Sequence, residues 1–368
     1  MRPLPTASFP ADLDVDYVEL YVADAETTAA AFRNRYGFAL AGATGSPAED
    51  CRSLAVTQGE ITLVLTEATA DTHPASRFVR AHGDGVADIA LHVTDATAAF
   101  TEAVRRGGRP VAEPRVHTGE FPIVTAAVAG FGDVVHTFVQ RDPADASRLP
   151  AGFTPVADAP DAAAGEPTLL DGIDHFAVCV PAGELDATID YYRTVLGFDR
   201  TFTERIVVGT QAMNSEVVQS SSRGVTFTVI APDTSAEPGQ IDAFLAAHGG
   251  AGVQHVAFDT EDAVRSVRAL SARGVQFLST PGAYYDALVQ RVSPKNHQVG
   301  ELRALSLLVD EDHGGQLFQI FTRSVHERKT LFFEVIERIG AETFGSSNIK
   351  ALYEAVEVER LRQESAQR

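Results

Sequence analysis

Apolar and polar residues alternate along this chain in a pattern that occurs twice. Residues 16–22 open the first copy and residues 174–180 open the second, and both stretches predict a β-strand. Each is followed by a helical stretch that ends at a glycine, Gly37 in the first copy and Gly197 in the second. The pattern therefore predicts an internal duplication.

The match continues through later elements of both copies. Strands are predicted at 61–66 and 225–230, and later at 134–140 and 331–337; between them come amphipathic helices at 96–106 and 261–273. Each copy thus reads as β-α-β-β-β repeated. We expect an α+β fold of two tandem βαβββ-repeat domains, each an open barrel.

The expected boundaries follow from composition. The stretch from 141 to 167 is rich in Asp, Ala, Pro and Gly, which is typical of a linker. After the second copy, apolar residues at 349, 352, 353 and 356 have helical spacing. That stripe predicts a helix that either packs plainly or covers a ligand cavity. We expect an N-terminal domain at 14–141, a linker at 142–170, a C-terminal domain at 171–345 and a terminal helix at 346–368.

Composition narrows the classes of function. Of 368 residues, 50 are acidic and 30 basic, which gives a net charge of −20 and disfavours binding to nucleic acid or anionic lipid. No apolar run approaches the roughly 20 residues of a membrane span, and we see no signal peptide. Two cysteines exclude a disulfide scaffold and a cysteine-based zinc module. A cytoplasmic enzyme or binding protein is expected.

Candidate chemistry is confined to the second copy. There the predicted strands carry His175, His255 and Glu334, each within an apolar run. The first copy carries residues unsuited to binding a metal together at the matching positions: Tyr17, Asp88 and Thr137. One buried histidine is often an ordinary core residue, but a buried, unpaired Glu334 would be costly. Two imidazoles and one carboxylate form the facial triad of non-haem Fe(II) oxygenases, which leaves positions open for substrate and O₂. We therefore predict these three residues as ligands of one metal ion.

With these residues in place, the paired halves resemble the vicinal-oxygen-chelate, or glyoxalase-like, superfamily. The segments 314–321 (Gly-Gly-Gln-Leu-Phe-Gln-Ile-Phe), 332–338 and 345–357 are similar to those of the family that contains 4-hydroxyphenylpyruvate dioxygenase and 4-hydroxymandelate synthase. The resemblance covers about residues 14–358. It implies Fe(II) as cofactor, 4-hydroxyphenylpyruvate and O₂ as substrates, the terminal helix over the active site, and a homodimer as a possible assembly.

Departures from the dioxygenase pattern bear on the product. Ile349 stands where the dioxygenases carry phenylalanine, Thr228 where they carry proline, and Ile230 where they carry asparagine. These changes resemble those of the synthase branch. They imply oxidative decarboxylation with benzylic hydroxylation, which yields 4-hydroxymandelate and CO₂. The alternative is the dioxygenase reaction, which yields homogentisate.

The same resemblance implies a set of substrate contacts. Ser215, Gln319 and Gln219 could hydrogen-bond the phenol or the carboxylate of the substrate. For each contact the competing interpretation is ordinary strand packing. The residues that would line the ring pocket are Thr228, Phe202, Phe332, Phe344 and Ile349.

Two other classes of function stay open on the sequence. Paired βαβββ units also occur in binding proteins that sequester antibiotics, which need no metal triad. A catechol ring-cleaving dioxygenase would use the same triad on the same fold, and it would consume O₂ without releasing CO₂. The terminal segment disfavours the latter.

Overall fold

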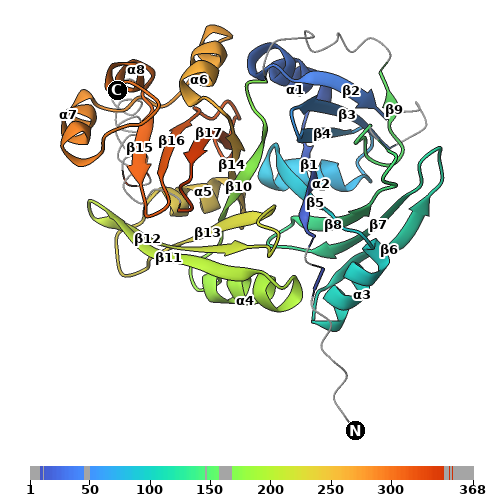
Figure 1. Cartoon of the computed structure of the whole chain (residues 1–368). Coiled ribbons are helices and arrows are strands. Elements are labelled where there is room, and N and C mark those ends of the chain that lie inside the picture. The colour runs from blue at the N-terminus through green and yellow to red at the C-terminus, as the bar shows by residue number, and fades with distance from the viewer. Residues whose placement is uncertain are drawn as a thin grey trace.

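The computed structural model describes residues 9–10, 12–44, 50–145, 147–156, 168–343, 348 and 350. They form two mixed β-sheets side by side, one from each half of the chain, with helices packed around them (Figure 1). The predicted α+β fold of tandem βαβββ repeats is confirmed. No helix in this described part is long and apolar enough to cross a membrane.

The first half forms a nine-stranded sheet with the order β6-β7-β8-β5-β1-β4-β3-β2-β9. Its central strand β1 pairs with β4 in parallel and with β5 in antiparallel orientation. The elements are β1 (Asp14–Tyr21), α1 (Ala25–Ala31), a π-helical turn (Phe32–Tyr36), β2 (Ala39–Ala43), β3 (Cys51–Gln58), β4 (Ile61–Ala68), α2 (Pro74–His82), β5 (Gly85–His92), α3 (Ala96–Arg105), β6 (Pro110–His117), β7 (Ile123–Ala129), β8 (Val135–Gln140) and β9 (Thr154–Pro155).

The second half repeats this arrangement in an eight-stranded sheet with the order β11-β12-β13-β10-β14-β17-β16-β15. It adds α7 and α8, which have no counterpart among the described residues of the first half. The elements are β10 (Gly172–Cys179), α4 (Leu185–Val195), β11 (Asp199–Val208), β12 (Gln211–Gln219), β13 (Thr226–Pro232), α5 (Gln240–His248), β14 (Gly252–Asp259), α6 (Ala263–Ala272), α7 (Gly282–Arg291), α8 (Val299–Leu305), β15 (Leu308–Glu311), β16 (Gln316–Phe321) and β17 (Phe332–Ile339).

Helix starts follow local chemistry. The side chains of Asp24, Asp95 and Asp262 accept hydrogen bonds from backbone amides at the starts of α1, α3 and α6. Gly37, which was predicted to end the first helical stretch, has a φ of +84°. This left-handed backbone conformation is strained for residues that carry a side chain. These caps place the helices between the strands as the sequence pattern predicts.

The expected linker at 142–170 is partly structured. Thr154 and Pro155 form β9, which pairs with Ala43 and Gly42 of β2. An edge strand leaves backbone groups unpaired, and even a two-residue strand can satisfy some of them. The terminal helix expected at 346–368 lies outside the described residues, except for Asn348 and Lys350.

One hydrophobic core joins the two halves. Phe333 on β17 packs edge-on against Phe32 and Tyr36 of the first half, with both ring centroids at 5.5 Å. Elsewhere Tyr192 of α4 contacts His136 of β8, whose Nε2 lies 2.7 Å from the tyrosine hydroxyl. The first half therefore supports the strand that carries Glu334.

Candidate metal centre

The three predicted ligands come from three neighbouring strands. His175 lies on β10, His255 on β14 and Glu334 on β17. Ala257 lies opposite both His175 and Glu334, and His255 lies opposite Ala177. Since opposite residues share a face of the sheet, all three side chains project to the same side. The register thus brings together residues that are at least 79 positions apart in the sequence.

Their ligand atoms converge. One ligand atom from each of His175, His255 and Glu334 lies within 4.8 Å of the other two, and all three residues are buried. Glu334 Oε2 is 3.4 Å from His175 Nε2 and 3.3 Å from His255 Nε2. The imidazole planes meet at 78°. Such a set can bind one divalent cation from one side.

The far nitrogen of each imidazole has its own partner. His175 Nδ1 lies 2.7 Å from Asp174 Oδ1, and His255 Nδ1 lies 3.3 Å from Gln254 Oε1. Both partners offer an oxygen that can accept the Nδ1 hydrogen, an arrangement that leaves each Nε2, on the side of Glu334, to bind a metal ion. Burial lowers the pKa of His255, which favours the neutral imidazole that binds metals.

Glu334 supplies the test of whether a metal fits. Its Oε1 is buried and accepts no hydrogen bond from the described residues. A buried carboxylate oxygen without a partner is costly, and a bound cation removes that cost. The nitrogen and oxygen donors, with no sulfur among them, suit a ferrous ion. The predicted triad therefore fits Fe(II).

The matching positions of the first half form a different arrangement. Asp88 accepts hydrogen bonds from both the amide (3.0 Å) and the hydroxyl of Thr137. Burial raises the pKa of Asp88 to about 7. Tyr17 occupies the position of His175. Asp88 and Thr137 thus satisfy each other's polar groups.

A second group with metal-ligand spacing exists outside the barrel, formed by Asp262, His297 and Glu337. Its atoms already have partners. Glu337 Oε2 lies 2.6 Å from His297 Nε2 and accepts from the Ala263 amide at 2.8 Å. Asp262 accepts from the Arg265 amide. This group caps the N-terminus of α6 and gives no evidence of a ligand.

Four of the predicted substrate contacts lie on the sheet face that carries the triad. Phe332 stacks on the His255 ring at 4.9 Å. Ser215, Thr228 and Gln319 are buried, and the strand register places them on the face that carries the triad. Thr228 Oγ1 has no hydrogen-bond partner among the described residues. These side chains are available to a substrate bound beside the metal.

The other four predicted contacts differ. Phe202 and Gln219 line a cavity of about 1020 Å³ between the two halves, and no triad residue lines that cavity. Gln219 Nε2 donates to Thr226 Oγ1 at 3.0 Å. Phe344 and Ile349 lie outside the described residues, so their placement stays a prediction.

Several residues of the site were not predicted. Asp174 and Gln254 hold the two imidazoles, and Phe321 contacts the edge of the His255 ring at 5.7 Å. Asn348 is fully buried: its amide donates to Tyr284 Oη and the Val309 carbonyl and accepts from the Asp310 amide. Asp174 and Gln254 directly precede the two histidines, and that adjacency was the available signal.

Comparisons with known proteins match both halves of the chain. The family model described as hydroxyphenylpyruvate dioxygenase, N-terminal, matches residues 13–149. The glyoxalase/bleomycin resistance protein/dioxygenase superfamily model matches residues 172–320. The 4-hydroxyphenylpyruvate dioxygenase of Yarrowia lipolytica is 32% identical over 94% of this chain and 91% of its own length. That of Dictyostelium discoideum is 33% identical over 93% and 96%.

A solved structure is similar over the same span. It is a triple mutant of 4-hydroxymandelate synthase from Streptomyces coelicolor, which superposes with a TM-score of 0.87 and is 42% identical, covering 95% of this chain and 99% of that one. A sequestering protein without catalysis does not account for these matches. The chain belongs to the 4-hydroxyphenylpyruvate dioxygenase family of non-haem iron dioxygenases.

Proposed function

We propose that this enzyme converts 4-hydroxyphenylpyruvate and O₂ into 4-hydroxymandelate and CO₂, with Fe(II) held by His175, His255 and Glu334. The observation that carries the proposal is the buried triad, whose carboxylate oxygen Oε1 has no partner among the described residues. The 42% identity to a 4-hydroxymandelate synthase, against 32–33% to two dioxygenases, supports the choice of product.

The side chains around the triad would bind and orient the substrate. A ferrous ion supplies a centre that a 2-oxo acid can chelate and at which O₂ is reduced. His175, His255 and Glu334 hold it from one side and leave the opposite side open. Phe332 and Phe321 exclude water beside His255. Full reduction of O₂ takes four electrons. Hydroxylation of the benzylic carbon supplies two of them, and oxidative decarboxylation of the substrate's 2-oxo acid group supplies the other two.

Product choice would depend on the position of the aromatic ring. The Ser215 hydroxyl, the Thr228 hydroxyl and the Gln319 amide are buried groups able to hydrogen-bond the phenol or the carboxylate. Ile230 follows Thr228 on the same face of β13 and is 4% exposed. A barrier difference of about 1.4 kcal/mol between benzylic and ring attack changes the product ratio tenfold. A modest change in the shape of the pocket wall formed by Thr228 and Ile230 is therefore sufficient to change the main product.

The test is the identity of the product. The apo-protein is incubated with Fe(II), ascorbate, O₂ and 4-hydroxyphenylpyruvate, and the products are separated by chromatography. We expect 4-hydroxymandelate as the main product, in equal amount to the CO₂ released. Homogentisate as the main product would overturn the proposal and favour the dioxygenase reaction named for the curated relatives. Turnover of a catechol without CO₂ would favour ring cleavage.

The residue at 349 offers a sharper test of product choice. We expect Ile349→Phe to shift the product toward homogentisate, because the resemblance gives the dioxygenases a phenylalanine at the matching position. Val116→Phe is the control, since Val116 is 61% exposed on β6. An unchanged product ratio in Ile349→Phe would show that this position does not decide the partition.

A further inference from the structure

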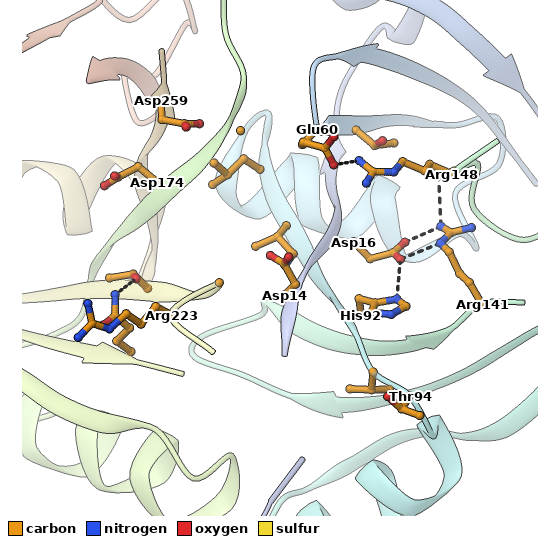
Figure 2. Close-up of a pocket in the computed structure, with 18 of the residues that line it drawn as sticks. Asp14, Asp16, Glu60, His92, Thr94, Arg141, Arg148, Asp174, Arg223 and Asp259 are labelled. Atoms are coloured by element: carbon orange, nitrogen blue, oxygen red, sulfur yellow. Dashed lines mark hydrogen bonds and ion pairs between the residues drawn. The ribbon is translucent and has the colours of Figure 1, made fainter. Parts of the chain in front are cut away.

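In each half, an aspartate on the first strand forms an ion pair with an arginine. Asp174 directly precedes the predicted ligand His175, and Asp16 directly precedes Tyr17, which occupies the matching position in the first half. In the second half, Arg338 Nε and Nη2 donate to the two carboxylate oxygens of Asp174, at 2.5 and 2.8 Å. In the first half, Arg141 donates in the same way to Asp16, at 2.7 and 2.5 Å. Figure 2 shows Asp174 on one side of the interdomain cavity and Asp16, paired with Arg141, on the other.

Both arginines also bind the chain that follows their strand. Arg338 donates to the Thr343 carbonyl at 2.6 Å, and Arg141 donates to the Leu149 carbonyl at 2.7 Å. This part of the arrangement is common to the half with a metal triad and the half without one. It therefore does not by itself depend on the metal triad.

The two carboxylates differ in one contact. Asp174 Oδ1 also lies 2.7 Å from Nδ1 of the adjacent His175. In the first half the residue after Asp16 is Tyr17, and Asp16 instead lies 3.7 Å from His92 Nδ1. The second half thus uses the shared ion pair to hold an imidazole that faces the triad.

We propose that Asp174 is a positioning residue for the metal ligand His175, and that Arg338 holds Asp174 in place for that task. This rests on the proposed iron site. The carboxylate keeps the hydrogen of His175 on Nδ1, so that the Nε2 lone pair points at the ion. It also fixes the ring plane, since both Asp174 oxygens are already held by one guanidinium.

The substitution Asp174→Asn separates this role from general packing. Two N–H groups of Arg338 and Nδ1 of His175 point at the two oxygens of Asp174. Asparagine offers one amide oxygen, so in either orientation its amide nitrogen faces one of these donors, and it lacks the negative charge that strengthens the contacts. The hold on the His175 ring is therefore weaker in this variant. Asp16→Asn is the matched control, because it makes the same change in the same type of ion pair away from the triad.

The experiment measures Co(II) binding to the apo-protein without O₂, from the visible absorption of the bound ion. We expect Asp174→Asn to weaken Co(II) binding about 10- to 100-fold, with Asp16→Asn unchanged. Wild-type affinity in Asp174→Asn, or equal weakening in both variants, would overturn the proposal. Absence of Co(II) and Fe(II) binding by the wild-type protein would instead contradict the proposed function.

A second measurement examines the imidazole of His175 in the wild-type protein. Nitrogen-15 spectra of histidine-labelled wild-type apo-protein distinguish the two imidazole tautomers, and His175 is assigned from the signal lost in His175→Gln. We expect hydrogen on Nδ1 of His175. Hydrogen on Nε2 would overturn the positioning role, whatever the metal affinity of the variants.

Discussion

Thr228 carries a hydroxyl that the folded chain leaves without a partner among the described residues. A buried, unpaired hydroxyl destabilises a protein by about 1–3 kcal/mol. We therefore expect Thr228→Val, which keeps the shape, to raise the free energy of unfolding by about 1 kcal/mol. The same change removes a predicted substrate contact, and we expect KM for 4-hydroxyphenylpyruvate to rise about tenfold. Urea unfolding and steady-state kinetics measure the two effects.

Thr226 provides the matched control on the same strand. Its hydroxyl accepts a hydrogen bond from Gln219 at 3.0 Å, so Thr226→Val should lower the free energy of unfolding by about 1 kcal/mol. The two variants thus change stability in opposite directions. If Thr228→Val destabilises the protein and leaves KM unchanged, the Thr228 hydroxyl is neither unsatisfied nor a substrate contact.

At the scale of elements, the hairpin of β16 and β17 holds Glu334 against the two imidazoles. Gly315 directly precedes β16, at a point where the chain passes close to the end of β17. A Cβ added to Gly315 would lie 1.8 Å from the Ile339 carbonyl oxygen. We expect Gly315→Ala to lower the free energy of unfolding by about 3 kcal/mol and to weaken iron binding, because β16 must move away.

Gly300 is the control for that prediction. It lies in α8 with no atom within 4 Å of an added Cβ, so Gly300→Ala should raise stability by about 0.5–1 kcal/mol and leave iron binding unchanged. Thermal unfolding with and without Fe(II) compares the two variants. A fully stable, iron-binding Gly315→Ala would show that the strand end tolerates movement.

The duplicated elements and the triad could be predicted because they leave local and repeated signals. Strand periodicity predicted the strands that carry His175, His255 and Glu334. The contrast with Tyr17 and Asp88 at the matching positions of the first half then indicated metal binding. β9 could not be predicted, because two residues show no periodicity and pair only once β2 offers its edge. The same limit applies to the roles of residues whose partners are distant in sequence, such as Arg338 with Asp174.

Substrate contacts were harder to predict than metal ligands for a related reason. Metal ligands can be recognised from the chemistry of their side chains. Which residues line a substrate pocket depends also on how far along the strand each residue lies. Phe202 and Gln219 face the same side as Ser215, yet they lie at the end of the barrel that opens toward the first half. Alternation fixes the face of a side chain but not its depth along the barrel.

At the scale of the whole molecule, the first half is a support for the metal centre. Phe32 and Tyr36 pack on Phe333, the residue that precedes Glu334 in the chain. The two halves share one hydrophobic core, so movement of either half is coupled to β17. The first half can thus contribute to the rigidity of the candidate metal site.

The first half should also set how stability depends on pH. Burial raises the pKa of Asp88 to about 7, with Glu19 opposite it on β1 contributing. Between about pH 4 and 7 the folded state then holds a proton that the unfolded state releases. The free energy of unfolding should therefore fall as pH rises through this window, by up to about 1.4 kcal/mol per pH unit, and level off above it.

Asp88→Asn should remove that slope and stabilise the protein at pH 8, because the amide oxygen can still accept from the Thr137 amide. Urea unfolding across the pH range measures both proteins. Identical slopes in the two proteins would show that Asp88 is ionised throughout in the folded state.

Iron stoichiometry tests the central claim most directly. The apo-protein, Glu334→Ala, His255→Ala and the control Asp88→Asn are each titrated with Fe(II) without O₂, and bound iron is counted after removal of free metal. We expect one Fe(II) per chain in the wild-type protein and in Asp88→Asn, and no stoichiometric iron in the two triad variants. One tightly bound Fe(II) in either triad variant would contradict the claim that His175, His255 and Glu334 form the metal site.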